Sequence, residues 1–114
     1  MEQTTLFQIL SDETRLRALA LMHTAGEVCI CELVYALELS QPKISRHMAA
    51  MRDAGLAMPR RDAQWVFYNL SPNLPEWQQK VVSAALEGLK NTAIITADLA
   101  RLKSMSNRPE RCAA

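Results

Sequence analysis

The sequence predicts a small, mainly α-helical domain with one short β-hairpin, organised as a winged helix-turn-helix that dimerises through its terminal helices. Three observations support this fold class. Apolar residues recur every three or four positions through most of the chain, which is the spacing of a buried helix face. Two such segments, 31–39 and 40–55, follow each other with only a tight turn between them. The period then changes over residues 57–70, which are rich in strand-forming residues.

The N-terminal part is predicted to form two helices. The first covers the apolar residues Leu6, Phe7, Ile9 and Leu10. Ser11 or Asp12 can cap the second helix, because their side-chain oxygens accept hydrogen bonds from the free N–H groups of a first turn. This second helix ends near Gly26. Its apolar face is formed by Leu16, Leu19, Ala20 and Met22.

The helix predicted after Ser40 has the features of a helix that reads DNA. Ser40 is a favourable cap, and Pro42 is tolerated in a first turn, where its missing N–H has no helical partner. Gly55 is suited to end the helix in a left-handed conformation. The buried face is predicted to consist of Ile44, Met48 and Met51. Together with the helix over 31–39, this segment forms a helix-turn-helix.

Residues 57–70 are predicted to form the wing of this domain. Strand formers are concentrated in the segment WVFY at 65–68, and the preceding segment RDAQ at 61–64 has the composition of a turn. Tight two-residue hairpins favour glycine, which this turn lacks. A hairpin directly after a helix-turn-helix is the arrangement of a winged-helix domain.

A single long helix is predicted to begin at Asn73, where Glu76 three residues later completes a capping box. Its apolar residues continue at helical spacing to Leu102, further than a small domain needs to cover its core. We therefore expect a homodimer, with simple packing on the domain as the alternative. The predicted interface residues are Leu6, Leu10, Leu74, Trp77, Val81, Ala85 and Leu89. The domain is predicted to span residues 1–105, followed by a flexible tail over 106–114.

Positive charge is concentrated in the middle of the chain, although the net charge is only +1. Residues 1–40 carry two basic and six acidic residues (net −4), 41–64 carry five and two (net +3), and 65–114 carry six and four (net +2). A basic reading helix favours contact with DNA phosphates over an ordinary solvated surface. The predicted contacts to double-stranded DNA are Ser40, Gln41, Lys43, Ser45, Arg46, His47 and Arg52 in the helix and Arg60, Arg61 and Gln64 in the wing.

Cys29 and Cys31 lie directly ahead of the helix-turn-helix, and Cys112 lies near the end of the chain. No signal peptide or membrane-spanning run is visible, so we expect a cytoplasmic protein with reduced thiols. Thiolates prefer soft ions. The predicted ligands for such an ion are Cys29 and Cys31. The alternative is two small buried hydrophobic side chains.

The spacing of the two thiols predicts the backbone conformation in which both can bind one ion. In a regular helix, residues two apart point roughly 200° away from each other, so two such thiols cannot bind one ion there. In an extended segment the same spacing places both on one side. We therefore expect the ion to bind a state in which the start of the 31–39 helix is unwound. A helix N-terminus also lowers the pKa of cysteine, which would favour ligation.

Residues 6–103 resemble the ArsR family of metalloregulatory winged-helix repressors. The resemblance rests on LSDETRLR at 10–17, VCICEL at 28–33, SQPKISRH at 40–47 and RDAGL at 52–56. It implies a homodimer that binds a palindromic operator and releases it when trivalent arsenic or antimony binds, with no organic cofactor. Arsenic sensors of the family carry a third cysteine three residues after the second, where this chain has Val34. The candidate third ligand is therefore Cys112, from the same or the partner chain, or else a small thiol or a hydroxide. The zinc site of other members is not expected, because residues 74–105 contain no histidine.

Other functions stay open at the level of sequence. The same fold could respond to oxidants or electrophiles through Cys29 and Cys31, although a disulfide across a C-x-C spacing is strained. A cadmium or lead sensor would need more thiolates than this pair supplies. If the protein were a thiol metallochaperone, the basic helix would have no function. The sequence contains neither a nucleophile–base pair nor a glycine-rich phosphate loop, so an enzyme is the least expected class.

Overall fold

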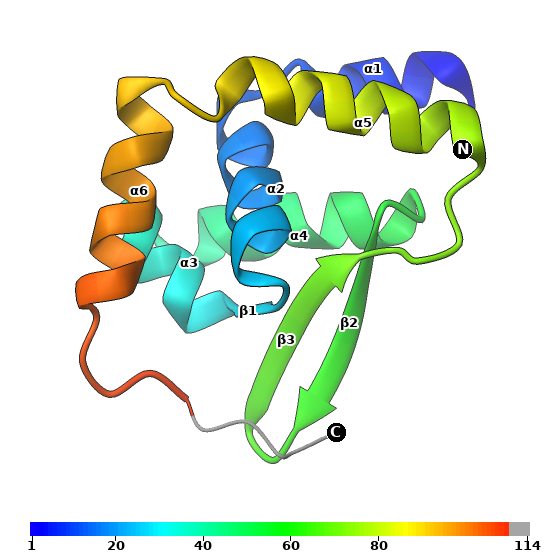
Figure 1. The fold of residues 1–114 in the computed structure, drawn as a ribbon. Coiled ribbons are helices and arrows are strands. Elements are labelled where there is room, and N and C mark those ends of the chain that lie inside the picture. Colours follow the sequence, from blue (N-terminus) through cyan, green and yellow to red (C-terminus); the bar gives the residue numbers. More distant parts are fainter. Residues whose placement is uncertain (110–114) are drawn as a thin grey trace.

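The computed structural model describes residues 1–109 and has six helices and three strands over that range (Figure 1). The helices are α1 (Gln3–Leu10), α2 (Glu13–Ala25), α3 (Ile30–Leu37), α4 (Gln41–Asp53), α5 (Glu76–Leu89) and α6 (Ala93–Ser104). The strands are β1 (Val28–Cys29), β2 (Ala57–Asp62) and β3 (Trp65–Leu70). This arrangement confirms the mainly helical fold with a hairpin wing. Within residues 1–109, no helix is both long and apolar enough to cross a membrane.

Helix α2 forms the centre of the core. It contacts α1, α3, α4, α5, α6 and β3. A helix that is packed from several sides buries more than one face, so Leu21 is as fully buried as Leu19. Asp12 caps the helix by accepting a hydrogen bond from the Arg15 N–H at 3.0 Å, and Gly26 ends it with a φ of 84°.

The helix-turn-helix consists of α3 and α4, as predicted. The turn between them begins at Glu38, whose φ of 56° reverses the chain direction. Ser40 then caps α4, because its Oγ accepts from the Lys43 N–H at 3.4 Å. Gly55 follows α4 with a φ of 86°, a left-handed conformation that suits glycine. The predicted buried face of α4 (Ile44, Met48 and Met51) is confirmed.

The wing is larger than the predicted hairpin. Strands β2 and β3 pair antiparallel from Ala57↔Leu70 to Asp62↔Trp65, and Ala63 turns the chain with a φ of 54°. A third strand, β1, pairs with the other edge of β3 and gives the order β1-β3-β2. A two-residue strand leaves no periodic signal in the sequence, so it was not predicted. It holds Cys29 opposite Phe67.

The prediction of one long C-terminal helix from Asn73 is wrong. Helix α5 begins at Glu76 after Pro75, without a side-chain cap, and ends at Leu89. Thr92 then closes the break, since both its N–H and its Oγ1 donate to the Leu89 carbonyl. The apolar residues predicted to form one stripe are therefore buried against two different helices. Helix α5 packs on α2, whereas α6 packs mainly on α3. Figure 1 shows the two helices running in different directions.

The break changes which residues are available for a dimer interface. Leu6 was predicted to lie there, but it is fully buried inside its own chain because α1 packs on α2. Its predicted surface role is therefore wrong for this conformation. Trp77 remains 38% exposed and Phe7, which was not predicted, is 55% exposed. The other predicted interface residues are half-buried and keep part of their surface: Leu10, Leu74, Val81, Ala85 and Leu89.

Candidate functional site

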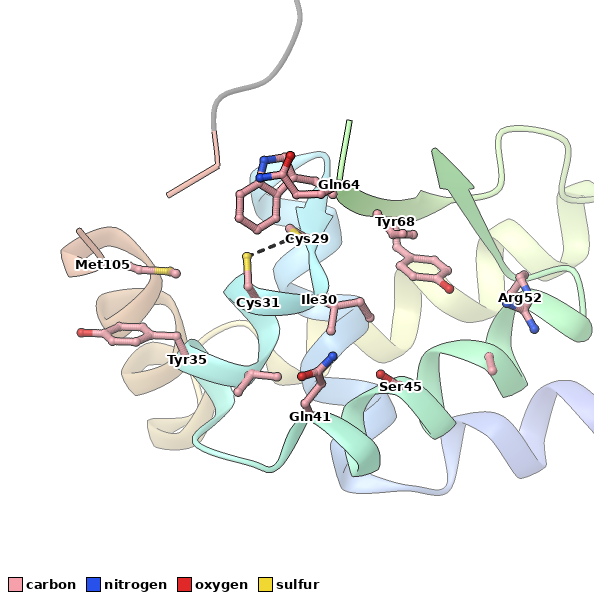
Figure 2. A pocket seen from close by; sticks show the side chains of 14 residues that line it. Cys29, Ile30, Cys31, Tyr35, Gln41, Ser45, Arg52, Gln64, Tyr68 and Met105 are labelled. Atoms are coloured by element: carbon pink, nitrogen blue, oxygen red, sulfur yellow. Dashed lines mark hydrogen bonds between the residues drawn. The ribbon is translucent and has the colours of Figure 1, made fainter. Parts of the chain in front are cut away.

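The thiols of Cys29 and Cys31 lie against each other at the start of α3 (Figure 2). Their sulfur atoms are 3.2 Å apart. Cys29 is the residue before the helix and has extended backbone angles, φ −83° and ψ 154°, whereas Cys31 belongs to the first turn. Cys29 is buried at 2% exposure and Cys31 is half-buried. The pair is therefore placed to bind one ion through two sulfur atoms.

This geometry corrects the expectation that α3 must unwind. The expectation assumed that both cysteines would lie in the helix, where they would point apart. Because Cys29 lies in β1 and only Cys31 is helical, the two side chains meet while the helix is intact. The structure thus supports two-sulfur binding without loss of helical turns.

The expected low thiol pKa is wrong for Cys31. Burial, together with the hydrogen bond to Cys29, raises the pKa of Cys31 to about 12. The backbone N–H groups at the start of α3 still act to lower the pKa of Cys31, but burial and the Cys29 contact outweigh them. The Cys31 thiol is therefore protonated at neutral pH, and a ligand has to displace that proton.

A buried carboxylate organises the backbone around the thiols. The Cys29 N–H donates to Glu32 Oε1 at 2.8 Å, and Glu32 is fully buried. Arg108 reaches back from the segment after α6 and donates through Nε to Glu32 Oε2. The end of the described chain is thereby held near the thiols, and Pro109 is buried.

A third protein donor is not found near the thiols in the described part of the chain. Across residues 1–109, no three His, Cys, Asp or Glu side chains form a group that could hold a metal ion. Val34 occupies the position, three residues after Cys31, where the resemblance would place a third cysteine. Cys112, the candidate third ligand, lies outside the described residues.

The thiols face a groove of about 850 Å³ between α3, α4 and β3. Helix α4, the helix predicted to read DNA, forms one side of this groove. Figure 2 shows Gln41 and Ser45 of α4 across from Cys31. The lining residues are Cys29, Ile30, Cys31, Val34, Tyr35, Gln41, Ser45, Ala49, Arg52, Gln64, Trp65, Val66, Tyr68 and Met105. The thiol pair and several predicted DNA contacts therefore share one cavity.

Most of the residues predicted to touch DNA are on the surface. Those that are exposed are Ser40, Gln41, Arg46, Arg52, Arg60, Arg61 and Gln64, and those that are half-buried are Lys43, Ser45 and His47. The imidazole of His47 lies 3.8 Å from Asp12, and burial lowers the pKa of His47 despite that carboxylate. His47 is therefore mostly neutral at pH 7, which weakens the case for a phosphate contact.

Two of the predicted phosphate contacts have protein partners. Arg60 pairs with Glu27 through two hydrogen bonds of 2.7 and 2.8 Å, and its guanidinium lies 5.0 Å from the centre of the Phe67 ring. It therefore joins β2 to the segment before β1. Arg52 pairs with its neighbour Asp53 at 3.1 Å, the local pairing that is common for exposed arginines. Arg61 and Gln64 remain exposed at the end of the wing.

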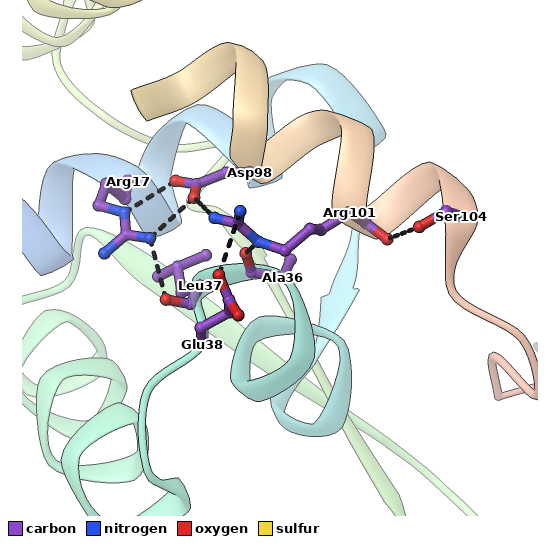
Figure 3. Close-up of polar contacts among 7 residues, drawn as sticks. All are labelled: Arg17, Ala36, Leu37, Glu38, Asp98, Arg101 and Ser104. Atoms are coloured by element: carbon purple, nitrogen blue, oxygen red, sulfur yellow. Dashed lines mark hydrogen bonds and ion pairs between the residues drawn. The ribbon is translucent and has the colours of Figure 1, made fainter. Parts of the chain in front are cut away.

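Sequence reasoning missed a buried ion cluster between α2, α3 and α6 (Figure 3). Arg17 makes two hydrogen bonds of 2.8 and 2.7 Å to Asp98, which is fully buried. Arg17 also donates to the Leu37 carbonyl at 2.9 Å. Arg101 joins Asp98 to the same end of α3, since it donates to Asp98 Oδ1 and to the Ala36 carbonyl at 2.6 Å. The cluster thus binds the carbonyl end of α3, where a helix attracts positive charge.

A sequence signal for this cluster exists in retrospect. Arg17 interrupts an otherwise apolar part of α2, and Asp98 interrupts the apolar residues of α6. Two opposite charges in two buried helix faces indicate a pair. The pairing itself could not be predicted, because the two residues are 81 positions apart.

Comparison of the sequence with known families and proteins gives a consistent result. Residues 12–58 match the family described as "Bacterial regulatory protein, arsR family". The arsenic resistance transcriptional regulator ArsR1 of Pseudomonas putida is 48% identical over 107 residues, which is 92% of this chain and 80% of that protein. The arsenical resistance operon repressor of Escherichia coli is 50% identical over 80 residues, 70% of this chain and 68% of that protein.

Solved structures show the same fold. HlyU from Vibrio cholerae superposes with a TM-score of 0.67 at 30% identity, over 80% of this chain and 100% of that chain. The antimony-specific transcriptional repressor AntR superposes with a TM-score of 0.63, over 76% of each chain. Because its identity is 20%, this second likeness concerns the fold alone.

Proposed function

Because this chain belongs to the arsR family of bacterial regulatory proteins, we propose that it is a transcriptional repressor that releases its operator on binding trivalent arsenic or antimony. One structural observation supports trivalent arsenic or antimony as the ligand. Two thiols lie with their sulfur atoms 3.2 Å apart, in a groove that the recognition helix α4 helps to line. The arsenic resistance regulators of Pseudomonas putida and Escherichia coli support the same assignment by their sequence identity.

Helix α4 and the wing would bind the operator. In winged helix-turn-helix proteins, the first turns of the second helix reach base edges in the major groove. Gln41, Lys43 and Arg46 occupy those turns, and glutamine suits adenine whereas arginine and lysine suit guanine. Ser45 lies on the same turns, and Arg61 with Gln64 would reach backbone phosphates from the wing. A homodimer would place two such helices on the two half-sites of a palindrome.

The inducer would bind by exchange of ligands on arsenic. Arsenous acid carries three hydroxyl groups, and two of them leave as water with the protons of Cys29 and Cys31 while two arsenic–sulfur bonds form. No atom changes its oxidation state in this exchange. The third position would keep a hydroxyl group or take a small thiol or Cys112.

Binding at the thiols would be transmitted through α3. Cys29 belongs to β1 and lies at the start of α3, so its displacement moves the wing and the helix together. The other end of α3 is held by Arg17 and Arg101. A helix that is fixed at one end and displaced at the other shifts α4, which packs on it. The inducer has to prefer the displaced state for this coupling to release DNA.

The decisive experiment is release of operator DNA during titration with arsenite under reducing conditions, followed by fluorescence anisotropy. The operator is first obtained by selection from random DNA. Wild type is expected to release DNA, whereas Cys29→Ser and Cys31→Ser are expected to bind DNA normally and to need at least about a hundredfold more arsenite, since one sulfur is lost. Cys112→Ser reports whether the third cysteine contributes.

Three outcomes would contradict the proposal. Release of DNA from both single variants at the wild-type arsenite concentration would remove the thiol pair from the mechanism. Failure of wild type to release DNA would favour an oxidant sensor of the same fold. If no DNA sequence were bound at all, a thiol metallochaperone would fit better.

The protonated state of Cys31 makes a prediction about pH. Exchange of a protonated thiol with arsenous acid yields water and no free proton, so arsenite affinity is expected to be nearly constant between about pH 6 and about pH 8. A divalent ion such as cadmium releases the Cys31 proton, so its affinity is expected to rise about tenfold per pH unit for that thiol. Equilibrium dialysis at several pH values measures both. An arsenite affinity that falls as pH rises would show that the thiols are already ionised.

A further inference from the structure

The turn between α3 and α4 sets the direction in which α4 leaves the rest of the domain. It consists of Glu38, Leu39 and Ser40, between the end of α3 and the start of α4. Glu38 has left-handed backbone angles, φ 56° and ψ 44°. Residues with a long side chain seldom adopt this region, so a glutamate stays there when the surrounding contacts hold it. The contacts made to this turn therefore help to decide where α4 points.

Arg101 of α6 contacts both the turn and the end of α3 (Figure 3). Its Nε donates to the Ala36 carbonyl at 2.6 Å, and its Nη1 lies 3.2 Å from Glu38 Oε1. Its Nη2 donates to Asp98 Oδ1 at 2.7 Å. The last carbonyls of a helix have no N–H of the same helix to accept from, so a side-chain donor satisfies Ala36 here. One guanidinium thus joins α6, the end of α3 and the first residue of the turn.

The guanidinium of Arg101 is itself held in place from inside the core. Asp98 lies three residues before it on α6 and is fully buried. Arg17 of α2 donates to the same carboxylate at 2.8 and 2.7 Å and to the Leu37 carbonyl at 2.9 Å. The two arginines therefore connect the last two carbonyls of α3 to α2 and α6. Such a connected set of charge-assisted hydrogen bonds fixes geometry more firmly than a single exposed ion pair does.

A small rotation at this turn is enough to disturb the reading of bases. At about 1.5 Å per residue, Arg46 lies about 7.5 Å beyond Gln41 along α4, so a rotation of about 10° moves it by about 1.3 Å. The donor–acceptor distances of hydrogen bonds vary over only about 0.5 Å. A loosened turn would therefore lose base contacts while α4 stays folded. Attraction to phosphates depends mainly on charge, so binding to DNA of any sequence would persist.

We propose that Arg101 is a positioning residue for operator recognition, which fixes the orientation of α4 by holding the end of α3 and the turn that follows. This inference rests on the proposed function, because it concerns binding of the operator. The role is separate from that of the thiols, since Cys29 and Cys31 lie at the start of α3 whereas Arg101 acts at its end. Arg101 does not line the thiol groove, so its loss is expected to leave arsenite binding within about twofold of wild type.

The test compares Arg101→Met with wild type on two DNA duplexes, the selected operator and an unrelated duplex of the same length. Fluorescence anisotropy at several salt concentrations gives both affinities and their salt dependence. Arg101→Met is expected to weaken operator binding at least about tenfold and to change binding of the unrelated duplex by less than about twofold. Lys103→Met is the matched control, because it removes the same charge from an exposed position of α6. It is expected to keep both affinities within about twofold.

A second variant separates geometry from charge. Lysine keeps the positive charge but has a single ammonium group, which cannot reproduce the planar fork that reaches Asp98, Ala36 and Glu38. Arg101→Lys is therefore expected to lose operator affinity at least about fivefold. Circular dichroism verifies that each variant is folded at the temperature of the binding experiment. Amide hydrogen exchange in both variants is expected to be faster at residues 37–41 and unchanged in α1, and unchanged exchange at residues 37–41 would count against the inference.

Four results of the binding experiment would overturn the inference. The first is unchanged operator affinity in Arg101→Met, and the second is an equal loss for the operator and the unrelated duplex, which would show a general role in stability. The third is a salt dependence lowered by about one unit of slope, because Arg101 would then contact a phosphate itself. The fourth is full operator affinity in Arg101→Lys, since only the charge would then matter.

Failure of this inference can be separated from failure of the proposed function. If wild type releases the operator on adding arsenite and Arg101→Met binds the operator as wild type does, the repressor function stands and Arg101 has no positioning role. If wild type binds no DNA sequence, the proposed function and this inference both fail.

Discussion

Asp98→Ala is expected to lower the free energy of unfolding by about 3–5 kcal/mol, because it leaves the buried guanidinium of Arg17 without its counter-charge. Asp98 is fully buried and accepts hydrogen bonds from both Arg17 and Arg101. Denaturation with urea, followed by circular dichroism at one fixed protein concentration, measures the change. A fixed concentration is needed because dimerisation adds to the apparent stability.

An exposed ion pair provides the control for this variant. Asp53 pairs with Arg52 at 3.1 Å, but its side chain is 71% exposed. Asp53→Ala is therefore expected to change the free energy of unfolding by less than about 1 kcal/mol. The double variant Arg17→Met with Asp98→Leu is expected to recover much of the loss, because it removes both charges. A loss below about 1 kcal/mol for Asp98→Ala would show that the cluster does not stabilise the packing of α6 on α3.

Arg46→Ala is expected to weaken operator binding about tenfold to about a hundredfold, corresponding to about 1–3 kcal/mol for a lost base contact. Arg46 is exposed on the first turns of α4 and no described protein partner accounts for its position. Its removal is also expected to leave arsenite binding unchanged, because Arg46 does not line the thiol groove. Fluorescence anisotropy at constant salt measures the affinity for DNA.

The choice of control distinguishes base reading from simple loss of charge. Lys80→Ala removes one positive charge from α5, where Lys80 pairs with Glu76, and is expected to leave operator affinity within about twofold. Arg61→Ala would remove a wing contact to phosphate and lower the salt dependence of binding by about one unit of slope. Unchanged operator affinity in Arg46→Ala would remove this residue from the predicted contacts.

Predictions from local pattern were accurate for the helix-turn-helix. Asp12 and Ser40 cap the helices for which they were considered, Gly55 takes the left-handed conformation, and the buried face of α4 is the predicted one. Each of these features depends on interactions within about four residues of the chain, which a sequence displays directly. The hairpin wing was recognisable for the same reason.

Predictions that depended on packing were less accurate. The stripe from Leu74 to Leu102 has helical spacing throughout, yet the chain turns at residues 90–92 because its two halves pack on different helices. Leu6 has the same apolar character as the residues left at the surface, and only the position of α1 on α2 decides that it is buried. Spacing shows which residues need burial but not which surface covers them.

For the candidate site, the sequence alone determined the chemistry, namely two thiols next to a basic DNA-reading helix and no third cysteine in the same segment. The tertiary structure decided how that chemistry is arranged. Pairing of β1 with β3 holds Cys29 outside α3, so the sulfur atoms meet at 3.2 Å with the helix intact. Burial raises the pKa of Cys31, and side chains of β1, α3, α4 and β3 line the groove beside the thiols. These properties arise from contacts between residues distant in the chain, which no local pattern encodes.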